Sequence, residues 1–418
     1  MKSSPEGRTI DEVQGKTYPR VLIVNGAPIG QKSGIGTLLA NFFRGWPRES
    51  LAQIVPYGSD PDLSLCNKTW VLDSLNGTET GKLRRGLVAS LHRKYELLLG
   101  YNLSPELQQW VEDFSPNVIY SYLEHPLITC LATLLSRHLS VPVIPDLRDE
   151  WHYLPAGCNL ISLWWFIRRE IDFKKIIKKA PFGMTTSDVM SKEYQKRYQR
   201  RFYTFMSCAD ASIYIPRQQQ RDPLSQKLRI IYTGSGPGLQ RWPIILKLAQ
   251  VVRELNHTGC DIELSIYIRM ELCSNLPPQG DGVFLFDFLD ERTLADRLGN
   301  SDVAILPEGF DRKSITYARL SFSSKLPVYL MSGCCILAIG PIEVNSIQYV
   351  KDNNLGVVIH DATSQILSAG LRELYEHWQK WEGIHIHNRQ FAIEHHSQQM
   401  VHEQLRALLI NACSKKLD

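Results

Sequence analysis

The sequence lacks the features that mark membrane, secreted and zinc-scaffold proteins. No apolar run approaches the 18 or so residues needed to cross a bilayer, and residues 1–20 are polar, without the apolar stretch of a signal peptide. The nine cysteines are scattered and show no C-x-x-C spacing, which fits reduced thiols better than disulfides or structural zinc. We therefore expect a cytoplasmic protein that is neither exported nor integral to a membrane and that holds no metal.

The chain also lacks a strong charge imbalance and internal repeats. Lysine and arginine total 47 against 43 acidic residues, and a net charge of +4 is too small to predict a nucleic-acid partner. No G-x-G-x-x-G fingerprint and no G-K-[ST] loop occurs. At 418 residues the chain is too long for one ordinary core, so two domains of roughly 200 residues are expected.

Buried strands and amphipathic helices alternate along the chain. Residues 20–25 form a short apolar run that ends in a glycine-rich turn, and a second cycle of the same kind begins at 228–232. Further strands are predicted at 118–120, 141–144, 263–268, 283–286, 303–306, 335–339 and 357–359, and helices at 37–43, 128–138 and 164–180. This order predicts an α/β protein with two Rossmann-like, doubly wound domains.

These patterns divide the chain into five parts. Residues 1–19 are predicted to be a disordered or polar tail, and 20–205 the first domain. A polar stretch around Gln218–Pro223 marks 206–227 as a linker. Residues 228–387 form the second domain, and 388–418 are periodic and helical.

The block from Phe322 to Pro341 combines a helix start with a buried strand. Ser323 and Ser324 can cap a helix whose free N–H groups bind an anion, and Lys325 adds a positive charge. The helix is predicted to stop at Gly333, before the apolar run 334–339. The block therefore predicts an anion site beside a parallel strand.

The same block resembles the segment F-P-S-K-L-x-E-Y-L-A-S-G-x-P-V-L-A of bacterial, family 4-like (retaining) nucleotide-sugar glycosyltransferases of the GT-B fold. The resemblance implies two Rossmann-like domains that face a cleft, the first for the acceptor and the second for the nucleotide sugar. It also implies that the last helix, 388–418, crosses back to the first domain. The nucleotide diphosphate-sugar is then a co-substrate, and no further cofactor is expected.

The second domain supplies the predicted donor site. Arg241 follows the loop Gly234–Gly238 after the strand at 228–232, and the resemblance places it on the donor diphosphate opposite Lys325. Two cations there would stabilise the charge that grows on a leaving diphosphate, although a solvated arginine at a helix start is the alternative. The donor-binding residues are predicted to be Ser235, Gly236, Ser324, Lys325, Glu308 and Leu289.

The first domain supplies the predicted acceptor side. Gly34, Ile35 and Gly36 belong to a glycine-rich loop after the first strand, which is either a ligand loop or a plain surface turn. Asp146, Arg148 and Asp149 lie in a stretch that resembles the D-x-R-D-x-W of these transferases. A self-satisfied Arg/Asp network is the alternative.

His125 is the remaining candidate of the first domain, as a hydrogen-bond donor to the sugar or as a structural histidine. We predict that Arg241, Lys325, His125 and Asp149 carry catalysis. Asp60-Pro-Asp62 spells a D-x-D metal motif, but such a turn-forming match is common by chance.

One residue departs from the family pattern. Val328 stands where the transferases carry a glutamate that holds the ribose hydroxyls, and valine cannot accept a hydrogen bond. The leading hypothesis is a metal-independent hexosyl- or related glycosyltransferase that acts with retention on an unknown acceptor. The alternatives are a catalytically degenerate binding partner and a sugar-nucleotide epimerase.

The segment 163–201 stands apart in charge. Between residues 168 and 201 there are 11 lysines and arginines against 4 acidic residues, after the apolar run 163–167. This composition is typical either of a peripheral contact with the inner face of a membrane or of a helix with a solvated basic face. The sequence does not predict the oligomeric state.

Overall fold

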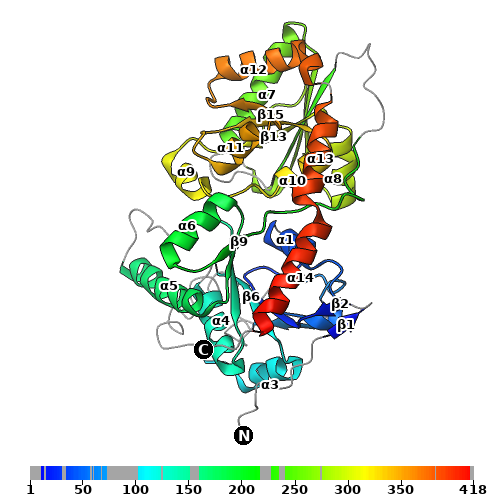
Figure 1. The fold of residues 1–418 in the computed structure, drawn as a ribbon. Helices are drawn as coiled ribbons and strands as arrows, with labels where there is room; N and C mark the ends of the chain where they lie inside the picture. The colour runs from blue at the N-terminus through cyan, green and yellow to red at the C-terminus, as the bar shows by residue number, and fades with distance from the viewer. Residues whose placement is uncertain are drawn as a thin grey trace, which may run out of the picture. The chain divides into compact units, whose positions relative to one another are not determined.

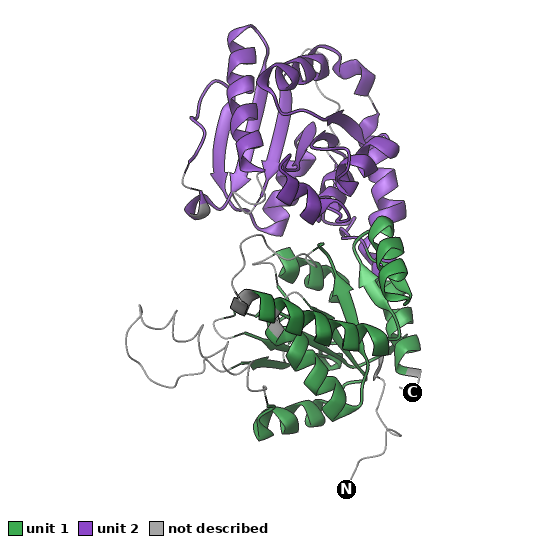
Figure 2. Ribbon diagram, turned by 90° about the vertical axis from the view of Figure 1, so that its left-hand side faces the viewer, with its two compact units in different colours: residues 1–205, 402–418 green, residues 206–401 purple. Residues whose placement is uncertain are grey.

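The computed structural model describes residues 11–13, 16–30, 34–56, 59, 61–66, 68–72, 102–123, 126–150, 160–216, 227–234, 241–273, 275–381 and 383–414. The chain forms two compact units, coloured separately in Figure 2. Unit 1 comprises residues 1–205 and 402–418, and unit 2 comprises residues 206–401. Each unit is built on a parallel sheet flanked by helices (Figure 1).

Unit 1 has a seven-stranded parallel sheet with the order β5-β4-β3-β6-β7-β8-β9. Its strands are β3 (Val21–Val24), β4 (Leu51–Val55), β5 (Lys68–Val71), β6 (Val118–Tyr122), β7 (Val143–Leu147), β8 (Gly183–Thr185) and β9 (Phe202–Thr204). Its helices are α1 (Gly34–Phe43), the 3₁₀ turn η1 (Arg48–Ser50), α3 (Pro105–Phe114), α4 (Pro126–Leu139), α5 (Leu160–Lys179) and α6 (Asp188–Tyr198). Every residue of β3, β4, β6 and β7 is buried, because helices cover both faces.

Unit 2 has a six-stranded parallel sheet with the order β12-β11-β10-β13-β14-β15. Its strands are β10 (Leu228–Thr233), β11 (Ile262–Ile268), β12 (Val283–Asp287), β13 (Val303–Pro307), β14 (Cys335–Ile339) and β15 (Gly356–Ile359). Its helices are α7 (Trp242–His257), η2 (Met270–Leu272), α8 (Glu291–Gly299), α9 (Arg312–Ala318), α10 (Leu326–Met331), α11 (Asn345–Asp352), α12 (Ser364–Glu376), η3 (Trp378–Trp381) and α13 (Ile384–His396).

The core of unit 2 lies on both faces of its sheet. Ile230 packs in one apolar cluster with residues of α7 and α12, whereas the next residue, Ile231, packs in another with residues of α8, α10 and α11. This alternation follows from the period of two in a strand. The two α/β halves predicted from the sequence are therefore present.

The N-terminal segment differs from the predicted tail. Residues of β1 (Asp11–Val13) and β2 (Lys16–Tyr18) form an antiparallel hairpin. Tyr18 is buried against Trp46, with ring centroids 5.1 Å apart. Tyr18 thus anchors the end of this largely polar segment in unit 1.

The described residues of the predicted linker, 206–216 and 227, belong to unit 2, whereas Gln218–Pro223 lie outside the described residues. Ala209 and Tyr214 are buried in unit 2, and Arg389 donates to the carbonyl oxygens of Tyr214 and Ala211. The predicted crossing helix is broken at Ser397, whose extended backbone separates α13 from α14 (Gln398–Ser414). From His402 onward α14 belongs to unit 1, where Arg406 donates to the carbonyl oxygen of Thr17.

No helix in the described part of the chain combines the length and apolar character needed to cross a membrane.

Candidate functional site

The strand order of unit 2 places its candidate site between β10 and β13. The chain leaves β10 toward β11 and β12 on one side and returns to β13, β14 and β15 on the other. In such sheets, ligands bind outside the carboxyl ends of the two strands where the order reverses. Thr233 ends β10 there, and Glu308 follows β13.

An arginine and a carboxylate meet at this edge. Arg241 is the N-cap residue of α7, and its Nε and Nη2 donate to Oε2 of Glu308 at 3.0 and 2.7 Å. The Glu308 side chain is 4% exposed and that of Arg241 is 30% exposed. A buried carboxylate therefore fixes the guanidinium group of Arg241, whose side chain is only partly exposed to solvent.

Lys325 lies at the same place and forms no ion pair with a carboxylate of the described residues. Its Nζ is 4.8 Å from the ring centroid of Tyr232, a cation–π contact. Burial, together with the charge of Arg241 and against the attraction of Glu308, lowers the pKa of Lys325 to about 7. Within the described residues, two cationic side chains thus share one carboxylate.

Tyrosines form the base of this site. The hydroxyl of the buried Tyr329 is 2.8 Å from the hydroxyl of Thr233, which fixes α10 to the end of β10. Burial raises the pKa of Tyr232 to about 12, so its ring stays neutral beneath Lys325. A Cβ atom at Gly234 would lie 2.5 Å from the hydroxyl of Tyr232, so the chain needs glycine after β10.

The structure modifies the predicted helix start at Ser323 and Ser324. Neither serine caps a helix: the N-cap residue of α10 is Lys325, without a side-chain cap, and the helix has six residues. The N–H of Ser323 instead donates to the hydroxyl of Ser346 at 2.9 Å. Gly333 has the expected positive φ of 79°. The positive character of this site therefore rests on side chains and not on a long helix.

Val328 and Leu289 border the same unit-2 core. Both are partly buried and pack against the apolar cluster of α8, α10 and α11. Leu289 follows β12, which β11 and β10 separate from β13 in the sheet. Ser235 and Gly236, the other predicted donor-binding residues, lie outside the described residues, as does His125.

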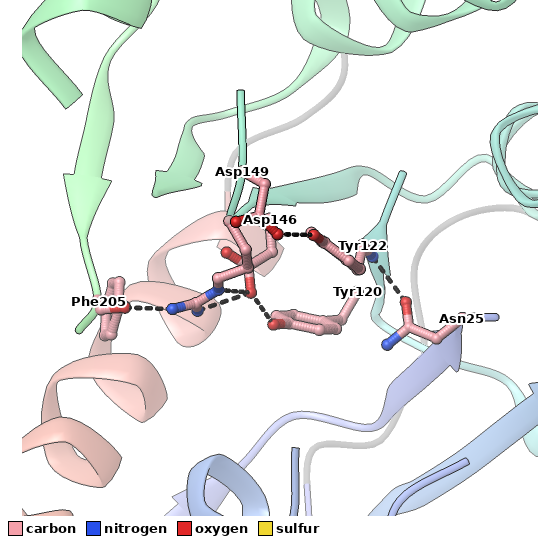
Figure 3. A network of polar contacts seen from close by, with 7 residues as sticks. Asn25, Tyr120, Tyr122, Asp146, Asp149 and Phe205 are labelled. Carbon is pink, nitrogen blue, oxygen red and sulfur yellow. Dashed lines mark hydrogen bonds and ion pairs between the residues drawn. The ribbon is translucent and has the colours of Figure 1, made fainter. Parts of the chain in front are cut away.

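Unit 1 carries a buried polar network at the end of β7 (Figure 3). Oδ2 of Asp146 accepts hydrogen bonds from Tyr120 and from Nε and Nη2 of Arg148, the latter two at 2.8 and 2.7 Å. Arg148 also donates to the carbonyl oxygen of Phe205 and lies 4.8 Å above the ring of Phe42. Asp146 and Arg148 therefore pair with each other, while Oδ1 of Asp146 is buried without a hydrogen-bond partner among the described residues.

Asp149 belongs to a separate, less buried contact. Its Oδ2 accepts from the hydroxyl of Tyr122 at 3.0 Å, and the N–H of Tyr122 donates to Oδ1 of Asn25 at 2.6 Å. Asn25 follows β3 and Tyr122 ends β6, and these are the two strands between which the order of the unit-1 sheet reverses. Asp149 is therefore the predicted acidic residue that lies at the switch point of unit 1.

The predicted loop at Gly34, Ile35 and Gly36 begins α1. A Cβ atom at Gly34 would meet nothing within 4 Å, and the carbonyl oxygen of Gly36 accepts from the N–H of Gly30 at 3.2 Å. Gly34 is exposed and Gly36 is buried. The structure therefore leaves open space at Gly34, the first residue of α1.

Sequence reasoning missed the tyrosines and Asn25. Tyr122 is the last residue of β6, Asn25 follows β3, and Tyr232 is the last residue but one of β10. A polar side chain at the end of an apolar strand is the signal that could have identified them. Among the described residues, no three His, Cys, Asp or Glu side chains are grouped to hold a metal ion.

Comparison with protein-family models and with curated protein sequences gave no match. Solved structures give clear likenesses. The sucrose-phosphate synthase of Thermosynechococcus elongatus has a TM-score of 0.61 at 12% identity, over 94% of this chain and 98% of that one. HepE of Anabaena in complex with UDP-glucose has a TM-score of 0.63 at 11% identity, over 94% of this chain and 100% of that one.

A glycosyltransferase from Rickettsia africae also has a TM-score of 0.63 at 11% identity, over 95% of this chain and 100% of that chain. These likenesses cover both units and both sheets. The chain therefore has the two-domain GT-B fold of these glycosyltransferases.

Proposed function

We propose that the protein is a glycosyltransferase that binds a nucleoside diphosphate sugar on unit 2, at Arg241 and Lys325. One observation carries the proposal: two cations share one carboxylate where the strand order of unit 2 reverses. A diphosphate would supply the missing negative charge. It would also stabilise protonated Lys325, because an opposite charge nearby favours the charged form.

The same charges support transfer of the sugar. When the glycosidic bond breaks, negative charge grows on the departing diphosphate, and positions fixed before the reaction stabilise that charge most effectively. The Glu308 carboxylate holds Arg241 in place, and the Tyr232 ring supports Lys325. The HepE complex contains UDP-glucose, so UDP and UDP-glucose are the first ligands to test.

Calorimetric titration with UDP at low salt tests the site. Lys325→Ala and Arg241→Ala should each weaken binding by about 10- to 100-fold, the value of one charged hydrogen bond. Arg253→Ala is a matched control, because Arg253 forms a similar pair with Asp281 near the other end of α7. Lys351→Ala, which removes an exposed lysine of the same unit, is a second control. Equal affinity in all four variants would exclude this site.

On unit 1 we propose that Asp149 acts on the acceptor side. Asp149→Asn keeps an oxygen that can accept from Tyr122, so the fold should persist. UDP affinity should then be unchanged while consumption of UDP-glucose falls at least tenfold. Loss of UDP binding in this variant would contradict the assignment of Asp149 to the acceptor.

Turnover should continue in the presence of a chelator, because two side-chain cations perform the charge neutralisation that a metal performs elsewhere. Activity that disappears in the chelator and returns with magnesium or manganese would contradict this part of the proposal. Retention of anomeric configuration and a hexose donor follow from the resemblance. Proton NMR of the first product formed tests the configuration.

Val328 favours a second candidate, a GT-B protein that binds nucleotide without turnover. Its side chain offers no acceptor to a ribose and packs on the apolar cluster of unit 2. UDP binding without consumption of any nucleotide sugar, over a panel of acceptors, would favour this candidate over the transferase.

A further inference from the structure

The basic segment of unit 1 forms one surface made by α5 and α6. The two helices contact each other and lie on the same side of unit 1 in Figure 1. Residues 168–201 contain 11 lysines and arginines and 4 acidic residues, a net charge of +7, whereas the whole chain carries +4. The rest of the protein is therefore net acidic, and its positive charge is concentrated here.

Exposed aliphatic side chains lie among these charges. Ile167 and Ile171 of α5 are 48% and 46% exposed, and Val189 of α6 is 47% exposed. The first two are four residues apart and lie one above the other on the helix surface. Lys174 and Lys178 continue the same stripe. The outer face of α5 thus changes from apolar to basic along its length.

Most lysines of this surface form no ion pair with the described residues. Arg168 and Lys175 share the buried Asp172, and Arg197 pairs with Glu150 and Glu193. The five other lysines of the segment pair with no carboxylate in the described part of the chain: Lys174, Lys178, Lys179, Lys192 and Lys196. A hollow beside them is lined by Gln195, Gln199, Arg200 and Arg201.

We propose that the α5–α6 surface, defined by Ile167, Ile171, Val189 and the five lysines, docks unit 1 on an anionic lipid bilayer. Aliphatic side chains gain free energy by entering the boundary between head groups and acyl chains, and lysines around them contact anionic head groups. Nucleic acid would use the charges but not the isoleucines, because bases stack on aromatic rings. The proposal does not depend on nucleotide binding by unit 2.

Co-flotation with vesicles tests the surface. The protein should float with vesicles of phosphatidylcholine and phosphatidylglycerol, and remain behind with phosphatidylcholine alone. Raising the salt concentration should weaken the binding. The triple variant Lys174→Gln, Lys178→Gln, Lys192→Gln should lower the partition coefficient by roughly a hundredfold, because each lysine contributes roughly fivefold. Ile167→Ser with Ile171→Ser should lower it by at least about tenfold.

Matched variants on unit 2 provide the controls. Lys313→Gln, Lys351→Gln and Lys380→Gln make the same change of net charge, and Ile366→Ser with Ile386→Ser removes two isoleucines that are also exposed. These variants should float like the unmodified protein, and thermal melts should show that all variants are folded. The proposal would be overturned if the control variants lost flotation, or if the unmodified protein did not float with anionic vesicles. It would also be overturned if Ile167→Ser with Ile171→Ser floated like the unmodified protein while an oligonucleotide displaced the protein from the vesicles. That result would indicate a nucleic-acid surface.

Discussion

Lys325 is the residue on which the electrostatics of unit 2 depend. Its pKa of about 7 lies below the usual value of 10.5, because burial and Arg241 disfavour the charged form. In an unfolded chain the lysine would keep its proton up to its ordinary pKa. The unliganded fold should therefore gain stability as the pH rises from about 7 toward 10.5, where only the unfolded chain still binds that proton.

Proton uptake on binding UDP follows from the same pKa. At pH 8, unliganded Lys325 is mostly neutral, whereas a bound diphosphate favours its charged form. UDP itself contributes little, because the second phosphate pKa is about 6. Calorimetry in buffers of different ionisation enthalpy should show uptake of nearly one proton. Lys325→Met should abolish this uptake and Lys351→Ala should preserve it; uptake that survives in Lys325→Met would assign the proton to another group.

Val328 offers a test of ribose recognition at a single position. The residue is three positions beyond Lys325 on α10 and partly exposed, so a glutamate there can remain solvated. Val328→Glu should tighten UDP binding by about tenfold, because a carboxylate can accept from the ribose hydroxyls. Val328→Leu is the control for shape. Weaker binding in Val328→Glu with an unchanged melting temperature would show that the added charge repels the diphosphate instead.

At the scale of elements, Arg148 ties the end of β7 to the residue that follows β9. Arg148 donates hydrogen bonds to the side chain of Asp146, in β7, and to the carbonyl oxygen of Phe205, after β9. The side chains of Arg148 and Asp146 are nearly inaccessible to solvent. Such a pair orders the carboxyl edge of the sheet, where Asp149 must be positioned. The main role of this pair is therefore to stabilise unit 1 and to fix the geometry of that edge.

Breaking this pair should be costly. Asp146→Asn removes the countercharge of a buried guanidinium group, and the free energy of unfolding should fall by about 3 to 5 kcal/mol. Asp281→Asn, in the exposed pair with Arg253, should cost much less, because solvent screens that pair. Urea denaturation measures both values. A small effect for Asp146→Asn together with strongly reduced turnover would mean that Asp146 touches substrate.

The elements differ in how much the sequence could predict. The strands at 228–232, 303–306 and 335–339 were predicted because a parallel strand covered on both faces is a continuous apolar run. β4, β5, β8 and β9 were missed. β5, β8 and β9 are three or four residues long and β5 is largely exposed, whereas the buried β4 carries the polar Gln53 within its apolar run. Length, burial and an uninterrupted apolar run therefore decide which strands can be predicted from a sequence.

The candidate site shows the same limit. Arg241 could be proposed because it follows a glycine-rich turn, Glu308 because it follows a strand, and Lys325 because it stands at a predicted helix start that resembles the family segment. The pairing of Arg241 with Glu308 could not be predicted, because the two residues are 67 positions apart and their contact depends on β10 lying beside β13. Sequence patterns predict which residues reach the edge of a sheet, whereas strand order decides which of them meet.

At the scale of the whole molecule, unit 1 is completed by the C-terminal helix. Leu405, Leu409 and Ala412 of α14 are buried. Ending the chain before His402 should destabilise unit 1 by about 3 to 6 kcal/mol, the burial of two leucines. Hydrogen exchange should show lost protection on β3 and β4, with β10 and β13 unaffected. Equal loss in both units would show that they unfold as one.

The hairpin of β1 and β2 meets α14 through Thr17 and Arg406, 389 positions apart in the sequence. During synthesis, Thr17 leaves the ribosome 389 residues before Arg406. Unit 2, which is continuous from residue 206 to 401, is available in full before unit 1 is. Unit 1 is therefore begun before unit 2 and completed after it, and its apolar surface around Trp46 stays without His402 until α14 has emerged.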